Sequence, residues 1–275
     1  MVRLCVASLA LIAAIPAFAQ DSPPPETIDT NMVTVGAGVA LVPDYVGSRD
    51  SKVVPVPGAR ISLDGFGLTL AGNRGWADLV PDNRGVKGFD WQLGPLANLN
   101  LNRSRKVSDP QVAALGKVPV AIEAGAQAGV AYQGLITSAY DRLSLTVGYV
   151  HDIGSVHKSY VITPAITYST PLSRKLFISV SGAADFAGRG FARRYYGVTP
   201  AGAAASGLAP FDPGKGWEDW NAGGVVDIAL TGDLTRGLQL VAGGSYTRLL
   251  GDFAASPIVR NRNQWIGAVG LAYTF

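Results

Sequence analysis

The sequence predicts an all-β fold: a transmembrane antiparallel β-barrel of about twelve strands, with ten strands as the alternative. Apolar residues make up 48% of the 275-residue chain, yet beyond the N-terminus no run approaches the ~20 consecutive apolar residues of a membrane helix. Large apolar residues instead alternate with small or polar ones from residue 32 onward, as in strands with two unlike faces. The sequence also ends on two aromatic residues within such a segment, where a soluble domain usually has a polar tail.

The first 19 residues are typical of a secretory signal peptide. One arginine precedes an apolar run over residues 4–15, and Ala17-x-Ala19 is the small-residue pattern at which such peptides are cleaved. An uncleaved membrane anchor is the alternative, and the shortness of the apolar run argues against it. Because the only cysteine, Cys5, lies in this segment, we expect the mature chain to have no disulfide and no cysteine metal site.

The rest of the chain divides into a short leader and one domain. Residues 20–31 are polar and rich in proline, which predicts a flexible periplasmic leader. Residues 32–275 carry the alternation and are expected to form the outer-membrane β-barrel domain. Removing Arg3 from the 23 basic residues leaves 22, against 20 acidic residues, and this balance argues against nucleic-acid binding.

The two faces of the strands differ in a way that indicates a membrane. Over the last segment Trp265, Val269, Leu271 and Tyr273 alternate with small or polar residues. The second face is mostly Gly, Ala, Ser, Thr, Asn and Gln, whereas a soluble sandwich would carry Lys and Glu there. We therefore expect the bulky face to meet lipid, the small polar face to line the lumen, and aromatic residues near strand ends to lie at the interfaces. A sheet with open edges is not stable in lipid, so the barrel must close.

The alternating runs give twelve predicted strands, and the connection lengths give their orientation. Bacterial barrels have short periplasmic turns and longer outer loops. Merging the third and fourth strands breaks this parity, which favours twelve strands. The predicted strands cover residues 32–42, 53–63, 66–72, 76–80, 88–101, 118–133, 140–152, 159–170, 175–187, 217–231, 236–248 and 263–275. The predicted outer loops are 43–52, 102–117, 188–216 and 249–262.

The end of the sequence also carries a targeting pattern. Gly270, Tyr273 and Phe275 form Gly-x-x-Tyr-x-Phe, which looks like the C-terminal signal by which the barrel-assembly machinery recognises outer-membrane barrels for insertion. Together with the signal peptide, this pattern predicts export through the periplasm to the outer membrane of a Gram-negative bacterium. The expected surroundings are therefore outer-membrane lipid and lipopolysaccharide.

Four stretches resemble a known family. They are VPDYVGS (residues 42–48), KVVPVPGARISL (52–63), the segment from RRYYGVTPAG to GKGW (193–217) and the segment from SYTRLLGDF to GLAYTF (245–275). Together they resemble the MipA/OmpV family of MltA-interacting outer-membrane proteins. The resemblance implies an outer-membrane β-barrel and, for part of the family, a scaffold between a lytic transglycosylase and a murein synthase. We expect the protein to act non-enzymatically and without a cofactor. A diffusion channel or porin-like pore for small solutes remains the alternative, and a barrel hydrolase is a weaker one.

No catalytic or metal site is predicted. A hydrolase would need a nucleophile, a base and an acid at one rim. The only histidines, His151 and His157, lie near Ser155 and Ser159, but closeness in sequence is not triad geometry. A polar outer loop explains these residues better, and the aspartates of the outer loops lack the dense spacing of a calcium site.

Six charged residues are expected to face the lumen. Charges inside a barrel must be hydrated or paired. The set carries both signs, so we favour salt bridges that close the lumen, and a narrow polar pore is the alternative. These residues are Arg60, Asp90, Glu123, Arg142, Asp185 and Asp227.

Basic residues gather in the predicted outer loops. Guanidinium groups bind phosphate in a bidentate manner, so we expect this set to contact lipopolysaccharide, with simple solvation as the alternative. The residues are Arg103, Arg105, Lys106, Arg193, Arg194, Arg260 and Arg262.

The longest outer loop contains a predicted short helix over residues 199–207. Thr199 suits the N-cap, Pro200 the first turn and Gly207 the C-terminal cap. An irregular loop is the alternative. As a helix, the segment could fold over the mouth of the barrel.

Overall fold

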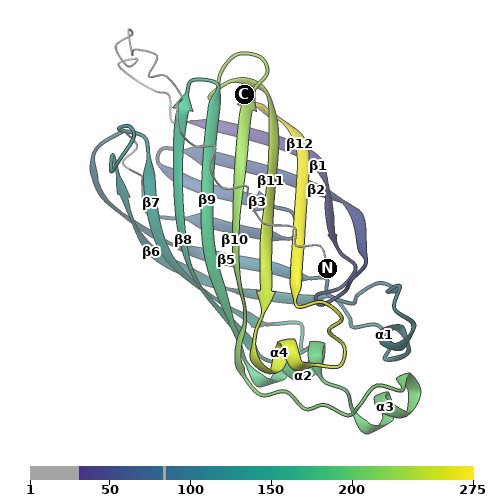
Figure 1. The fold of residues 1–275 in the computed structure, drawn as a ribbon. Coiled ribbons are helices and arrows are strands. Elements are labelled where there is room, and N and C mark those ends of the chain that lie inside the picture. Colours follow the sequence, from purple (N-terminus) through teal and green to yellow (C-terminus); the bar gives the residue numbers. More distant parts are fainter. Residues whose placement is uncertain (1–30, 83–84) are drawn as a thin grey trace, which may run out of the picture.

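The computed structural model describes residues 31–82 and 85–275. The predicted signal peptide and all but the last residue of the leader lie outside the described residues. Twelve antiparallel strands form a closed barrel in which each strand pairs with its sequence neighbours and β1 pairs with β12 (Figure 1). The predicted fold class is therefore confirmed. The strands are β1 (Met32–Pro43), β2 (Ser51–Leu63), β3 (Phe66–Ala71), β4 (Arg74–Asp78), β5 (Gly88–Asn100), β6 (Ala121–Gln133), β7 (Arg142–Asp152), β8 (Tyr160–Ser173), β9 (Leu176–Ala187), β10 (Gly216–Ala229), β11 (Gly237–Leu249) and β12 (Asn263–Thr274).

The bulky face of the sheet points outward. On β5, Trp91 is 66% exposed whereas its neighbour Asp90 is only 3% exposed, so consecutive side chains lie on opposite sides of the wall. On β7, Leu145, Val147 and Tyr149 are exposed in the same way. An apolar surface of this kind suits lipid acyl chains and does not suit water.

Aromatic side chains pack in pairs near both ends of the outward face. Toward the end that carries the helices, the ring of Tyr246 lies 5.3 Å from that of Trp220 and 4.8 Å from that of Trp265. Toward the opposite end, the rings of Phe89 and Tyr132 lie 5.0 Å apart, edge to face. Two such groups match the interfacial girdles of a membrane barrel.

The two ends of the barrel are built differently. One end has short turns, among them Asp64-Gly65, in which both residues have positive φ, 52° and 84°, as a two-residue hairpin turn requires. The other end carries α1 (Pro110–Ala114), α2 (Arg189–Tyr196), α3 (Pro200–Ser206) and α4 (Gly251–Ala255) (Figure 1). Of the described helices, none has the length and apolar character to cross a bilayer. By the usual orientation of bacterial barrels, the helical end is the outer end.

The wall is short at β3 and β4. These strands have 6 and 5 residues, whereas a membrane strand typically has ~9–11. Their hairpin reaches only the middle of β2, where Gly72 N donates to Pro57 O at 2.9 Å. In the described structure, residues 51–56 of β2 pair with β1 alone. Pro55 has the same parity as Pro57, so both face this free edge, and neither has an N–H group.

The loop helices are only partly foreseen by the sequence. For α3 the prediction is confirmed: the Thr199 side chain accepts from Gly202 N, and Gly207 caps the C-terminus in the left-handed conformation. Helices α1, α2 and α4 were not predicted. The sequence did hold a signal for α1, because Asp109 caps it and Pro110 occupies its first turn.

Candidate functional site

Helix α2 lies across the outer mouth of the barrel. Its buried residues are Phe191, Ala192, Tyr195 and Tyr196, a stripe along one face of the helix. They form one apolar cluster with residues from the wall and from two other outer loops: Val118, Ala187, Leu249 and Phe253. The Tyr196 and Phe253 rings meet edge to face at 5.1 Å, so α2 and α4 hold each other in place.

A second apolar cluster joins the remaining outer segments. It consists of Tyr45, Val107, Val112, Val198, Leu208 and Ile258. Burial raises the pKa of Tyr45 to about 12, so its hydroxyl stays protonated and donates to Ile258 O at 3.1 Å. The two clusters together make the outer loops a packed cap, with its own core, on the end of the barrel.

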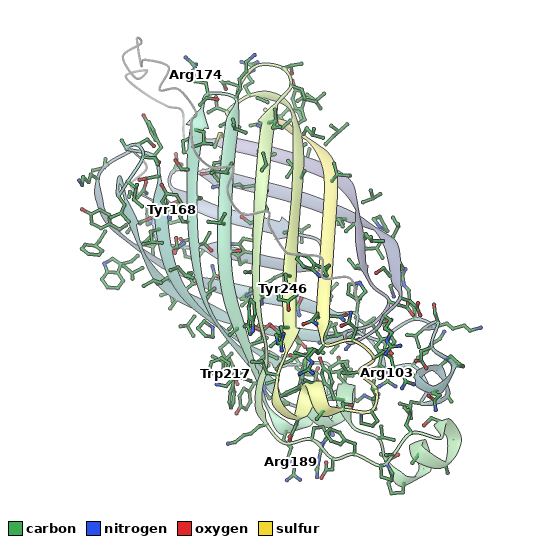
Figure 2. The ribbon with its side chains drawn as sticks, in the orientation of Figure 1. Arg103, Tyr168, Arg174, Arg189, Trp217 and Tyr246 are labelled. Atoms are coloured by element: carbon green, nitrogen blue, oxygen red, sulfur yellow. The ribbon has the colours of Figure 1, made fainter. Side chains whose placement is uncertain are left out.

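The buried side chain of Arg103 links segments of the cap, and its position corrects the prediction that this residue contacts lipopolysaccharide. Arg103, expected to contact lipopolysaccharide, is 5% exposed and lies among the outer helices (Figure 2). It donates to Tyr195 O at 3.4 Å and to Gly116 O at 3.2 Å. Burial lowers the pKa of Arg103, and the nearby charge of Arg194 acts in the same direction. Its guanidinium group therefore stabilises the cap and is not available to a lipid phosphate.

Arg260 also has a role within the cap. Its Nε donates to Asp109 Oδ2 at 2.7 Å, and its Nη2 donates to Gln111 Oε1 at 2.6 Å. The hydrogen bond from Arg260 is the largest of the effects that hold the pKa of Asp109 below its ordinary value. Arg260 thus links the last outer loop to the start of α1.

The remaining basic residues of the predicted set lie on the outer surface of the cap. Arg193 pairs with Asp212, which also pairs with Arg189 at 3.1 Å. The others are Arg105, Lys106, Arg194 and Arg262, all exposed. Contact of these exposed residues with lipopolysaccharide stays a prediction.

The six expected lumen charges all lie on the inward face of their strands, in different surroundings. Near the periplasmic end, Arg142 pairs with Asp90 at 2.6 Å and with Asp82 at 3.0 Å. Asp227 lies within electrostatic reach of Arg60, which is exposed to the lumen. Glu123 and Asp185 lie near the outer end. Salt bridges therefore hold part of the expected set together.

The histidines do not form a catalytic site in the described structure. His157 is buried, and its Nε2 lies 3.0 Å from Glu123 Oε1, so it is a packed residue of the cap and not part of a solvated loop. Glu123 also accepts hydrogen bonds from Asn98 and Asn100. His151 is exposed at the end of β7. Within the described ranges neither imidazole is hydrogen-bonded to a serine.

Two residues of the expected insertion signal, Gly270 and Tyr273, lie on the last strand, and Phe275 directly follows it. Tyr273 and Phe275 are exposed on the outward face, and their rings lie 4.8 Å apart. Gly270 lies on the inward face where β12 meets β1, and a Cβ there would come within 2.8 Å of Ala37 O. Its role in this close approach is structural; recognition by the assembly machinery stays a prediction.

Two acidic residues that lie inside the barrel, Glu218 and Asp219, were not predicted from the sequence. The register of β9 and β10 shifts between Trp217 and Asp219, and this β-bulge lets Glu218 and Asp219 both be buried while Trp217 and Trp220 both point outward. The sequence held a signal: two aromatic residues three positions apart cannot both face lipid on a regular strand.

The middle of the lumen is open to solvent. Val225 and Ile266 lie on the inward face, since their neighbours Val226 and Trp265 point outward, yet they are 41% and 38% exposed. Ser181, also inward, is exposed as well. The cap thus packs at the outer end of a tube whose middle is not filled by side chains.

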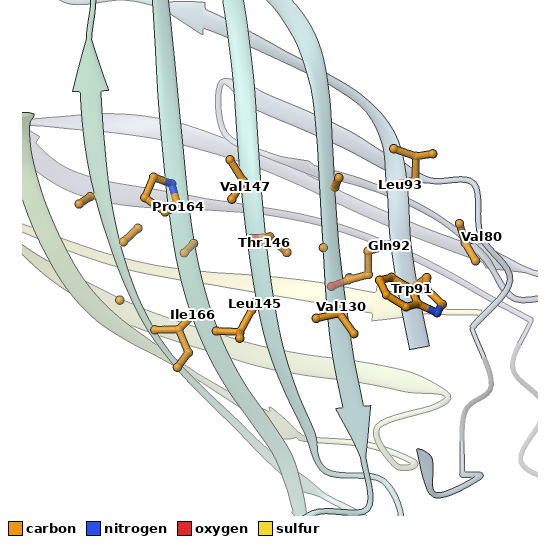
Figure 3. A pocket seen from close by; sticks show the side chains of 16 residues that line it. Val80, Trp91, Gln92, Leu93, Val130, Leu145, Thr146, Val147, Pro164 and Ile166 are labelled. Carbon is orange, nitrogen blue, oxygen red and sulfur yellow. The ribbon is translucent and has the colours of Figure 1, made fainter. Parts of the chain in front are cut away.

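A shallow apolar groove of about 1030 Å³ lies over β5 to β9. Figure 3 shows the side chains that line it, among them Trp91, Leu93, Leu145 and Ile166. All four are exposed on the outward face. Acyl chains meet such a surface in any membrane barrel, and the groove is not a solute site.

A closed barrel with an apolar outer face, two aromatic girdles and a polar lumen defines an outer-membrane β-barrel protein. The model of the MltA-interacting protein MipA family matches residues 35–275. The chain belongs to this family, and its location is the bacterial outer membrane. No curated protein matches the sequence.

Solved barrel structures are similar to this chain at low identity. The NanC porin is 8% identical, with 88% of this chain and 98% of that chain covered, at a TM-score of 0.42. An outer-membrane channel from Pseudomonas putida F1 is 12% identical, with 93% and 100% covered, at a TM-score of 0.46. The CymD monoaromatic hydrocarbon channel is 10% identical, with 90% and 89% covered, at a TM-score of 0.41.

Proposed function

We propose that the protein is a non-enzymatic scaffold of the outer membrane that holds a lytic transglycosylase, and with it a murein synthase, at the periplasmic end of the barrel. The observation that carries this proposal is the packed cap, in which α2 and the first apolar cluster bury their side chains at the outer end. A barrel with such a cap on its outer end is poorly suited to diffusion. The family to which the chain belongs is described as MltA-interacting protein, and this description supports the choice of partner.

Site-specific cross-linking tests the partner and the side of contact together. Arg174 and Arg189 are exposed arginines at opposite ends of the barrel (Figure 2). In a chain with Cys5 replaced by Ser, a photo-cross-linker is attached at Arg174→Cys or Arg189→Cys, and purified MltA-type lytic transglycosylase is added. We expect an adduct from position 174 and none from position 189. Equal adducts from both positions, or none from position 174, would contradict the proposal.

A porin-like pore is the second candidate, and the open middle of the lumen favours it. Planar-bilayer recording separates the two functions. A scaffold gives no steady conductance, whereas a pore gives reproducible open-channel steps. The double variant Phe191→Ala/Phe253→Ala, which loosens the cap, serves as the positive control, because it should conduct even where the natural protein does not.

A further inference from the structure

The cap carries a small pocket where three outer segments meet. Its volume is about 380 Å³, within the range of about 300–1,000 Å³ that is usual for small-molecule sites. The loop between β1 and β2, the segment that leads into α1 and the loop between β11 and β12 all contribute to it. The lining residues are Tyr45, Ser48, Arg49, Asp50, Ser108, Asp109, Pro110 and Arg260.

The floor of the pocket is fixed by the packing of the cap. Tyr45 is 2% exposed, and the Arg260–Asp109 ion pair acts electrostatically on its hydroxyl. Asp109 is also the N-cap of α1, and Arg260 N donates to Gly47 O at 2.7 Å. A site that is formed before its ligand arrives loses little conformational entropy on binding.

The rim of the pocket offers hydrogen-bonding groups that the protein itself does not use. Arg49, Asp50 and Ser108 are all exposed. Arg49 Nε donates to Arg260 O at 3.0 Å, whereas its two Nη atoms have no partner among the described residues. The Asp50 carboxylate and the Ser108 hydroxyl likewise have none within those ranges. The rim thus presents a guanidinium donor, a carboxylate acceptor and a hydroxyl that can do both.

The charges that line the pocket balance. Two guanidinium groups, of Arg49 and Arg260, accompany two carboxylates, of Asp50 and Asp109. A phosphate in the pocket would meet like charge from the carboxylates, and a metal cation would meet like charge from the guanidinium groups. In the described part of the chain, no group of three or more His, Cys, Asp or Glu side chains is placed to hold a metal ion. The balance favours a neutral ligand.

A sugar is a neutral ligand that suits this mixture of donors and acceptors. Each sugar hydroxyl donates one hydrogen bond and accepts others, so neighbouring hydroxyls can donate to Asp50 and accept from Arg49. Tyr45 and Pro110 supply carbon surface for the C–H groups of a pyranose ring.

We infer that the pocket binds a neutral hexopyranose unit that reaches it from the outside of the cell. The unit belongs either to a free saccharide or to the saccharide part of lipopolysaccharide, and the chemistry of recognition is the same for both. This inference does not depend on the scaffold role, which concerns the opposite end of the barrel.

The test uses fluorescent proteoliposomes that carry the full-length barrel, because many copies on one vesicle make weak single-site binding measurable. An array presents neutral oligosaccharides of glucose, galactose and mannose, the dephosphorylated core saccharide of lipopolysaccharide, and the same core with its phosphates. We expect retention on the neutral oligosaccharides, the dephosphorylated core or both. Retention on the neutral oligosaccharides alone identifies free saccharides as the source, and retention on the dephosphorylated core identifies lipopolysaccharide.

Substitutions at the rim test the site itself. Asp50→Asn removes the charged acceptor, Arg49→Gln removes the guanidinium donors, and Ser108→Trp fills the pocket from an exposed position. Each should lower retention at least ten-fold. The matched controls, Asp212→Asn and Arg189→Gln, change exposed charges of the cap that do not line the pocket and should leave retention unchanged. Folding of each variant is checked by the heat-dependent shift in gel mobility.

Three results would overturn the inference. The first is no retention of the natural protein above that of vesicles without protein. The second is full retention of folded Ser108→Trp and Asp50→Asn. The third is retention on the phosphorylated core alone, which would indicate an anion site. Ser108→Trp is the decisive variant, because it leaves every charge in place, whereas Arg49→Gln also removes the hydrogen bond to Arg260 O.

Discussion

The two ends of the barrel are stabilised by different interactions: apolar packing at the outer end and hydrogen bonds in the turns at the periplasmic end. The outer end buries two apolar clusters, and most contacts there join residues far apart in the sequence, as Arg103 and Tyr195 do. The periplasmic end closes with short turns held by hydrogen bonds within a turn, such as those of Asp141, and by a few links between turns, such as the Arg174–Asp233 pair. A substitution in the core of the cap should therefore loosen several loops at once, whereas a substitution in a periplasmic turn should affect mainly that turn.

Loss of the ring at the centre of the cap should have the largest effect. Phe253 is 1% exposed and packs on Tyr196, so Phe253→Ala should destabilise the cap by about 3–5 kcal/mol. Limited proteolysis of the refolded barrel should show new cleavage in several outer loops at once. The control is Phe66→Ala, an exposed ring at the periplasmic end, which should leave the pattern unchanged. Cleavage confined to the α4 loop would show that the cap is not one cooperative unit.

Removal of the buried cation should have the next largest effect. Arg103→Met leaves Tyr195 O and Gly116 O without their donor and should cost about 1.5–3 kcal/mol. Urea titration of cap opening, followed by protease sensitivity, measures this loss. Arg103→Lys should recover only part of it, since a lysine keeps the charge but lacks the planar fork. Full stability of Arg103→Met would refute the tethering role.

At the periplasmic end, Asp141 should give a smaller and pH-dependent effect. Burial alone would raise its pKa, but hydrogen bonds from Thr137, Ile136 and Leu135 N–H and from Tyr168 OH outweigh burial and hold the pKa well below its ordinary range. Asp141→Asn should cost about 1–3 kcal/mol at neutral pH.

The sign of the pH dependence follows from this lowered pKa. The stabilisation by Asp141 is present above the unfolded-state pKa of about 4 and is lost as the pH falls below it. The difference in unfolding free energy between Asp141→Asn and the natural protein should therefore shrink between pH 7 and pH 3. A constant difference over that range would contradict this account of the turn.

The exposed ion pairs on the cap should have the smallest effect. Arg193 and Asp212 are both solvated, and exposed pairs contribute little to stability. Arg193→Ala should leave protease resistance and unfolding midpoint unchanged within error. A measurable loss would mean that the outer surface of the cap belongs to the cooperative unit.

The sequence predicts the barrel well because lipid imposes a strict period of two. On β7 and β12 the residues at every second position face lipid and are mostly apolar. The number of strands, and the side of the wall on which each residue lies, can therefore be predicted from the alternation in the sequence. Boundaries are less certain: β8 continues to Ser173, three residues past the predicted end, and Pro171 and Leu172 within it resemble a turn as much as a strand. The short β3 and β4 were also recognised, because Asp64-Gly65 marks the turn that separates β3 from β2.

The cap could be predicted only where a local signal exists. Helix α3 has clear caps, whereas the N-cap residue of α2 is Gly188, which has no side chain to cap the helix. The burial of Arg103 depends on a contact 92 residues away, which no local pattern reveals. Glu218 and Asp219 were missed because the bulge between Trp217 and Asp219 breaks the alternation on which the strand prediction relies.

The free edge of β2 has a consequence for a crowded membrane. A strand with unpaired N–H and C=O groups invites a neighbouring chain to add to the sheet. Along the outer half of β2, Pro55 and Pro57 offer carbonyl groups but no donors, and the Pro57 carbonyl already accepts from Gly72. A second barrel that approached this edge would therefore find fewer hydrogen-bond donors there than a regular edge strand offers.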